Sequence, residues 1–360
     1  MKTKTSKRCE QKFLFNPEEH TNSAQSELSI WGNHTGLINP YPGSKRNFNK
    51  YPIWDGRQYD FIVEPCVGSG HFTTWALSNG IVKKAFVADN NYGVHGVWET
   101  WTDNEYRKRV WKAINQLIGK NFRDKSWATA QNAFAFLKDA IDSYHPENIA
   151  SNHLDFIVAT IVIRRLIFGS FLRNNTKGLL NVCLSQDKFQ SIQNWHFQWP
   201  WLPDNSQIII EDDALKLCDR INAESIGMTR GLCLFDPPYW VPQAPGTERR
   251  GTGAMTPAYP DHLPSEGALF DFTIKVLDKL LSSRKIGRVV FTNYINDRLC
   301  DAVQQLADKH NQKYWFKDLG PLQRSNNYAE TRTDPFREGW WEFGGNQMHG
   351  KFNEMSLLSE

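Results

Sequence analysis

Short apolar runs separated by turns recur along the chain, and their spacing predicts alternating strands and helices. The run at 59–63 (YDFIV) predicts a strand that ends at Glu64, and the glycine turn VGSGH then leads into a helix through Ala76. A second strand is expected at 85–88, ending at Asp89. Strand, turn, helix and strand in this order are typical of the start of a doubly wound parallel sheet.

The same strand signal resumes after residue 205. Unbroken apolar runs occur at 207–211 (QIIIE), 231–235 (GLCLF) and 288–293 (RVVFTN), and such runs are typical of strands that helices cover on both faces. The predicted fold class is therefore α/β, with a Rossmann-like sheet. Between 99 and 205 the periodicity is helical and Trp, Arg and Lys are frequent, which predicts an inserted helical module.

These patterns divide the chain into four predicted parts. Residues 1–37 are polar and aperiodic, so we expect a loosely ordered N-terminal extension. The main α/β domain is expected at 38–98 and 206–345, the helical insert at 99–205, and a C-terminal tail at 346–360.

The composition indicates the cellular compartment of the protein but does not identify a binding partner. The formal net charge of +3 is too small to identify a partner. The six cysteines form no CxxC pair and no cluster with histidine, which argues against a structural zinc site and a disulfide framework. The most apolar stretch, FIVATIVIRRLIFGSFL, contains Arg164 and Arg165 and is interpreted as a core helix. We therefore expect a cytoplasmic protein with no membrane span and no bound metal.

A candidate ligand site is formed by the first strand and the turn that follows it. Glycines at 68 and 70 allow the backbone to approach a ligand closely. Glu64 precedes the turn, and Asp89 at the end of the next strand can accept hydrogen bonds from ribose hydroxyls. NAD-binding domains use similar arrangements, and a plain strand-to-helix connection is the structural alternative.

The segment Asp236-Pro237-Pro238-Tyr239 carries the sharpest chemical signal, because it follows an apolar strand where α/β sheets bind ligands. An exocyclic amino group is a poor nucleophile, since its lone pair is delocalised into the ring. Asp236 and the Pro237 carbonyl can draw the amino hydrogens out of that plane, while the prolines stiffen the turn and Tyr239 offers a ring face for an extruded base. The alternative interpretation is a Pro-Pro turn with an Asp cap.

Taken in order, the motifs PYPGSK, EPCVGSGHF, ADNN, RRLIFGSFLRNNTKGLLNV, IIIEDDAL and FDPPY resemble the Dam-like class of DNA adenine N6-methyltransferases over about residues 39 to 300. The resemblance implies an S-adenosylmethionine-dependent catalytic domain, an insert that recognises double-stranded DNA, and a catalytic role for Asp236 through Tyr239. The implied cofactor-binding residues are Tyr41, Lys45, Glu64, Pro65, Gly68, Gly70, Asp89, Asn90 and Asp213.

The same resemblance implies contacts with DNA. The block FGSFLRNNTKGLLNV is similar to a family block in the helical part that reaches DNA, and within it we select Arg173 and Lys177 as contacts. The run MTPAYPDH is similar to the family's loop after the catalytic segment, which implies that Thr256 and Tyr259 help to close the site over the base. Restriction protection, evasion of phage defence and regulation all stay open as biological roles.

The chain also departs from the family pattern. Cys66 stands where Phe is usual, Ser44 and Ser69 replace glycines, and the segment with Trp340 and Trp341 has no counterpart; for these two tryptophans we favour a core position. Cytosine N4 methylation uses the same amine chemistry and stays open. Glutamine methylation of a protein, for which NPPY is the usual variant, and a catalytically silent DNA-binding homologue are further alternatives.

Overall fold

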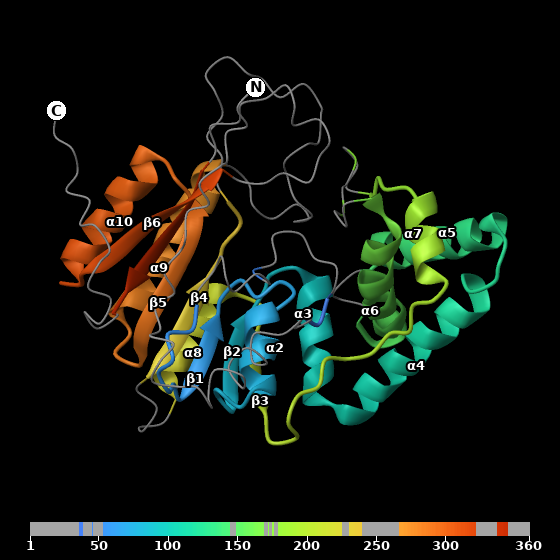
Figure 1. Cartoon of the computed structure of the whole chain (residues 1–360), viewed down its shortest axis with the longest axis horizontal. Coiled ribbons are helices and arrows are strands. Elements are labelled where there is room, and N and C mark those ends of the chain that lie inside the picture. The colour runs from blue at the N-terminus through green and yellow to red at the C-terminus, as the bar shows by residue number, and fades with distance from the viewer. Residues whose placement is uncertain are drawn as a thin grey trace, which may run out of the picture. The chain divides into compact units, whose positions relative to one another are not determined.

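The computed structural model describes residues 36–38, 45, 53–144, 149–168, 172, 175, 179–224, 230–239, 266–321 and 337–344. The chain divides into two units, Met1–His34 and Thr35–Glu360. All described residues belong to the second unit, in which helices and strands alternate as in an α/β fold (Figure 1).

A seven-stranded sheet forms the centre of this unit (Figure 1). Its strand order is β3-β2-β1-β4-β5-β7-β6, with every pair from β3 to β5 parallel and with β7 antiparallel to both of its neighbours. The order from β3 to β5 is that of a doubly wound sheet. The strands are β1 Phe61–Glu64, β2 Lys84–Ala88, β3 Gln207–Glu211, β4 Gly231–Phe235, β5 Ile286–Tyr294, β6 Tyr314–Pro321 and β7 Arg337–Phe343.

Five of these strands lie where the apolar runs predicted them, so the α/β class is confirmed. β3 and β4 have the same bounds as the runs at 207–211 and 231–235, and β1, β2 and β5 differ from their predicted bounds by two residues or fewer. β6 and β7 lie in a part of the chain for which the pattern predicted no strand.

Helices pack on both faces of the sheet. On one face, α8, α9 and α10 share a core cluster with alternate residues of the strands, such as Phe61 and Val63 of β1. Ile62 lies between them and therefore faces the opposite side, where α2 contacts β1 and β2. The bounds of these helices are α2 His71–Ser78, α8 Ala214–Ala223, α9 Glu266–Ser282 and α10 Asp297–Lys309.

The chain between β2 and β3 is helical, as its periodicity predicted (Figure 1). Its central helix α6 packs against α3, α4, α5 and α7, and Ile157, Val162 and Arg164 of α6 are all buried, which confirms a core helix. Recognition of DNA by these helices and the domain boundaries stay predictions. The elements are α3 Tyr92–Glu99, the 3₁₀ helix η1 Thr100–Thr102, α4 Asn104–Asn121, α5 Trp127–Asp142, α6 Ile149–Leu166 and α7 Gln186–Ile192.

Trp340 and Trp341 lie in the core, as favoured from the sequence. Trp341 is 1% exposed, and the centre of its ring lies 5.2 Å from that of Phe291 and 5.0 Å from that of Phe316. β7 therefore sits between β5 and β6 as an interior strand. Over the ranges that the structure describes, no helix has the length and apolar character needed to cross a bilayer, and no group of three His, Cys, Asp or Glu is arranged to hold a metal ion.

Candidate active site

The carboxyl ends of β1 and β4 lie next to each other at the centre of the sheet. The two strands are parallel neighbours, and the chain order of the strands changes direction between them. Such a switch point is where doubly wound sheets bind ligands. The glycine turn at 65–70 follows β1 and the segment at 236–239 follows β4, so the two strongest sequence signals meet at this position.

The glycine turn has a backbone that other residues do not fit. Gly68 and Gly70 adopt φ values of 50° and 61°, in the left-handed region. A Cβ atom on Gly70 would lie 2.0 Å from Cζ2 of Trp98. The Gly70 N–H donates to the Val67 carbonyl at 2.8 Å, which closes the turn. The turn is therefore specified by its own packing, at the edge where a ligand would approach.

Asp89 joins this turn to the end of β2. Its Oδ2 accepts a hydrogen bond from the Gly68 N–H at 2.9 Å, and its Oδ1 accepts one from the Asn91 N–H at 3.0 Å. Burial raises the pKa of Asp89, although both backbone hydrogen bonds and the charge of Arg164 act in the opposite direction. A carboxylate oxygen can accept more than one hydrogen bond, so each of these oxygens has acceptor capacity beyond the bond described.

Glu64 is a buried acid at the end of β1. Its Oε2 accepts hydrogen bonds from the backbone N–H of Thr73 at 3.0 Å and from the Thr73 hydroxyl. Burial raises the pKa of Glu64 to about 8, and the charge of Asp236 adds to this effect, while the bonds from Thr73 oppose it. None of these influences comes from a cation of the described residues, so Glu64 is largely protonated at neutral pH.

Acids predicted at three strand ends act electrostatically on Cys66, a thiol in the glycine turn. Burial raises the pKa of the Cys66 thiol well above its usual value, and the charges of Asp89, Asp236 and, more weakly, Asp213 raise it further. Asp213 also caps α8, because its Oδ1 accepts from the N–H groups of Leu215 at 2.7 Å and of Lys216 at 3.0 Å. The charges of three predicted site residues therefore act on one turn, and Asp89 also contacts it directly through Gly68.

Asp236 is held from two sides. Its Oδ1 accepts a hydrogen bond from the Thr292 hydroxyl of β5 at 2.6 Å, and its Oδ2 lies 2.6 Å from Nζ of Lys45. Pro237 is buried and Pro238 half-buried, and neither residue has an N–H that would compete for the carboxylate. Lys45 was expected at the cofactor from the resemblance; in the structure its ammonium group lies on Asp236.

Tyr239 connects this pair to a second carboxylate. Lys45 donates to the Tyr239 oxygen at 3.0 Å, and the Tyr239 hydroxyl donates to Oε1 of Glu338 at 2.6 Å. Burial and the charges of Asp236 and Glu338 raise the Tyr239 pKa well above its usual value, so the hydroxyl stays protonated and acts as a donor. We refer to Lys45, Asp236, Tyr239, Thr292 and Glu338 as the Asp236 cluster.

Thr292 and Glu338 are site residues that sequence reasoning missed. Thr292 is the next-to-last residue of a predicted strand, in the run RVVFTN, and its position near a carboxyl end was a usable signal. Glu338 is 99 positions away from Tyr239 along the chain, in a segment without a predicted strand. No local pattern points to it.

The other predicted residues divide into two groups. Pro65 is buried beneath the turn, and Asn90 is exposed beside Asp89. The remaining predicted residues lie outside the described ranges: Tyr41, Arg173, Lys177, Thr256 and Tyr259.

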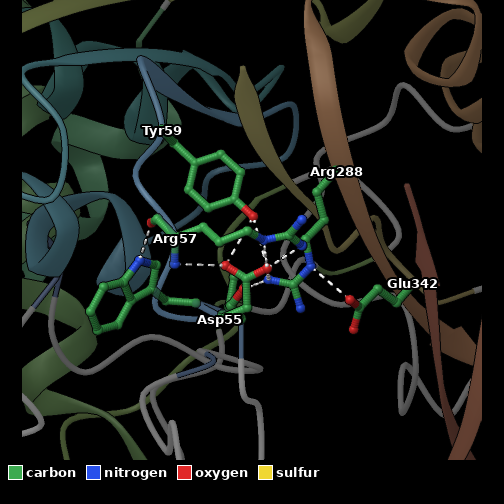
Figure 2. A network of polar contacts seen from close by, with 7 residues as sticks. Asp55, Arg57, Tyr59, Arg288 and Glu342 are labelled. Carbon is green, nitrogen blue, oxygen red and sulfur yellow. Dashed lines mark hydrogen bonds and ion pairs between the residues drawn. The ribbon is translucent and has the colours of Figure 1, made fainter. Parts of the chain in front are cut away.

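Figure 2 shows a second polar network, which includes Arg288 near the start of β5. Arg288, the third residue of β5, donates from Nε to Oε1 of Glu342 at 2.8 Å and from Nη1 to the Ile53 carbonyl, and it lies 3.6 Å from Asp55. Burial opposes the charged form of Arg288, but the bond to Glu342 and the charges of Glu342 and Asp55 together outweigh it and raise the Arg288 pKa. Thr292 follows Arg288 by four positions along β5, which places the two residues about 13 Å apart. We therefore assign this network to folding and the Asp236 cluster to the candidate site.

Comparisons of the chain with protein-family models and with curated proteins gave no match.

Proposed function

We propose that this protein is an S-adenosylmethionine-dependent DNA methyltransferase that methylates the exocyclic N6 of a flipped adenine. The observation that carries the proposal is the position of Asp236. Its carboxylate ends β4 at the switch point, beside the glycine turn and the acids Glu64 and Asp89. An acceptor for an amino group and a candidate cofactor turn therefore lie within one site.

The acids at the strand ends suit a cationic cofactor. Glu64 is buried with a raised pKa, and the described residues provide no positive group that offsets this rise. A positively charged ligand at the switch point supplies the missing partner. When bound, S-adenosylmethionine provides a methyl group activated by a positively charged sulfur. Asp89 supplies acceptor positions for ribose hydroxyls, and the glycine turn lets the backbone approach the ligand.

The residues of the chain act on the amine that receives the methyl group. Asp236 accepts one amino hydrogen and the Pro237 carbonyl accepts the other, which removes the nitrogen lone pair from conjugation with the ring. The ring of Tyr239 stacks on the extruded base, an interaction worth roughly 1–3 kcal/mol. After transfer, the excess proton leaves through Asp236 or water. The contribution of the protein is mainly orientation and hydrogen-bond acceptors.

The choice of DNA and of adenine is supported by the sequence resemblance rather than by the cluster. Asp-Pro-Pro-Tyr chemistry serves any amide-like exocyclic amine, whereas the PYPGSK loop and the FLRNNTKG block resemble those of adenine methyltransferases acting on DNA. A base inside a duplex must leave the stack before an enzyme can act on its amino group.

The test uses the full chain, methyl-labelled S-adenosylmethionine, and DNA from a host that lacks adenine methylation. We expect N6-methyladenine in the nucleosides analysed by mass spectrometry. Asp236→Ala should lower methyl transfer by at least about 10²-fold, the loss seen when one positioned hydrogen-bonding group is removed from an active site. Calorimetry should show that this variant still binds the cofactor.

Asp219→Ala is the matched control, because Asp219 is an exposed acid that pairs with Lys279 away from the site. Full activity in Asp236→Ala would contradict the assignment. N4-methylcytosine in place of N6-methyladenine would change the base, and label on glutamine would change the substrate class. The absence of any heat with S-adenosylmethionine would point to a silent DNA-binding protein.

A further inference from the structure

Glu338 reaches the Asp236 cluster because of the direction of β7. β7 is antiparallel to β5, and Glu338 is in register with Tyr294, the last residue of β5. The first residues of β7 therefore lie at the edge where the parallel strands end. A residue distant along the chain is placed beside Tyr239 and Lys45 in this way.

The buried carboxylate of Glu338 is paired with groups of the candidate site. Its side chain is 1% exposed, its Oε1 accepts from the Tyr239 hydroxyl at 2.6 Å, and Nζ of Lys45 lies 3.5 Å away. A buried carboxylate is strongly unfavourable unless it is paired and hydrogen-bonded. Glu342, on the same strand, pairs instead with Arg288 in the second network. Glu338 therefore belongs to the Asp236 cluster, and Glu342 belongs to the Arg288 network.

Lys45 is shared unequally between two carboxylates. Its Nζ lies 2.6 Å from Oδ2 of Asp236 and 3.5 Å from Oε1 of Glu338. The ammonium therefore binds Oδ2 of Asp236, while the Thr292 hydroxyl binds Oδ1. A substrate amino group that donates to Oδ2 of Asp236 competes with the ammonium for this oxygen, and a buried lysine without a carboxylate would be strongly unfavourable.

We propose that Glu338 is a positioning residue, which takes over the Lys45 ammonium when the substrate amino group binds Asp236 and holds the Tyr239 hydroxyl in place. The inference rests on the proposed function. The required movement is small, because Lys45 already lies 3.5 Å from Glu338. A carboxylate has acceptor positions on both of its oxygens, so Glu338 can bind the Lys45 ammonium as well as the Tyr239 hydroxyl.

Glu338→Gln tests the charge separately from the hydrogen bond. The amide oxygen still accepts from the Tyr239 hydroxyl, and Lys45 stays paired with Asp236, so we expect the variant to fold. Without a second carboxylate, Lys45 is held on Asp236. We expect kcat for methyl transfer to fall by about tenfold or more, the range for hydrogen bonds to charged groups, while the cofactor Kd by calorimetry stays near that of the unaltered protein.

Two further variants sharpen the comparison. Glu338→Asp keeps the charge and should recover part of the lost kcat. Glu342→Gln is the matched control, since it removes a carboxylate from the same strand but from the Arg288 network, and its kcat should be unchanged. The inference is overturned if kcat is unchanged in Glu338→Gln, if Glu338→Asp is no better than Glu338→Gln, or if only the KM for DNA changes.

Misfolding of Glu338→Gln and absence of methyl transfer by the unaltered protein lead to different conclusions. If Glu338→Gln does not fold, Tyr239→Phe is the second measurement, because it removes only the hydroxyl that donates to Glu338; kcat should then fall by about tenfold, and an unchanged kcat overturns the inference. If the unaltered protein transfers no methyl group to DNA, the proposed function fails together with the inference. If the unaltered protein and Glu338→Gln are both fully active, the role of Glu338 is disproved and the proposed function is unaffected.

Discussion

Replacing Glu64 by glutamine should make the protein more stable at neutral pH than it is with its natural residue. Glu64 is buried at the end of β1, and burial raises its pKa from 4.5 to about 8. Glutamine has nearly the same shape as the protonated acid, and its amide oxygen can accept both hydrogen bonds from Thr73. The substitution therefore removes the cost of keeping this acid protonated in the folded chain while the contacts are kept.

The magnitude follows from the shift in pKa. Between the unfolded pKa of 4.5 and the folded pKa of about 8, the folded chain holds a proton that the unfolded chain has lost. Stability therefore falls as the pH rises through this window and becomes level above it. One pKa unit corresponds to about 1.36 kcal/mol, so keeping this group protonated lowers stability by about 3 kcal/mol between about pH 5 and about pH 7.5.

Urea unfolding of both proteins across that pH window is the assay. The difference in unfolding free energy, Glu64→Gln minus the unaltered protein, should grow by about 3 kcal/mol from about pH 5 to about pH 7.5. Glu105→Gln is the control, because Glu105 is exposed on α4 and its substitution should leave the pH dependence unchanged. A constant difference for Glu64→Gln across the window would refute the interpretation of Glu64 as a buried, largely protonated acid.

The same acid connects stability with cofactor binding. A cation bound at the switch point lowers the Glu64 pKa, so binding should release a proton and affinity should rise with pH up to about 8. Calorimetry with S-adenosylmethionine in two buffers of different ionisation enthalpy measures this proton release. Glu64→Gln should show none from this group, and equal release by both proteins would place the cation away from Glu64.

Two further predictions concern the turn and the second network. Gly70→Ala should lower the unfolding free energy by at least about 2 kcal/mol, because φ is 61° and the new Cβ would meet Trp98, whereas Gly80→Ala, with φ of 66° and no atom within 4 Å, should cost only about 1 kcal/mol. Urea unfolding measures both, and equal losses would exclude the contact with Trp98 as a cause. Arg288→Ala should cost about 3–5 kcal/mol by leaving the largely buried Glu342 without its ion partner, while Arg57→Ala, with a side chain 42% exposed, should cost about 1 kcal/mol or less. A loss below that of Arg57→Ala would show that the buried network does not stabilise the fold.

The sequence by itself determined most of the parallel sheet and the two motifs at its centre. Strands of a parallel sheet carry consecutive apolar residues, so the runs QIIIE and GLCLF predicted β3 and β4 with their observed bounds. Gly68 and Gly70 marked a turn that needs positive φ, and this requirement is local. The Asp-Pro-Pro-Tyr segment carried its chemistry in its own residue types.

Only the tertiary structure decided which residues surround Asp236. Local periodicity predicts that a segment is a strand but not which strand it pairs with or in which direction. The antiparallel pairing of β7 with β5 brings Glu338 to the edge where β4 ends, and it buries Trp341 beside Phe291. Contacts between residues so far apart in the chain depend on how the whole sheet closes, and no short pattern encodes them.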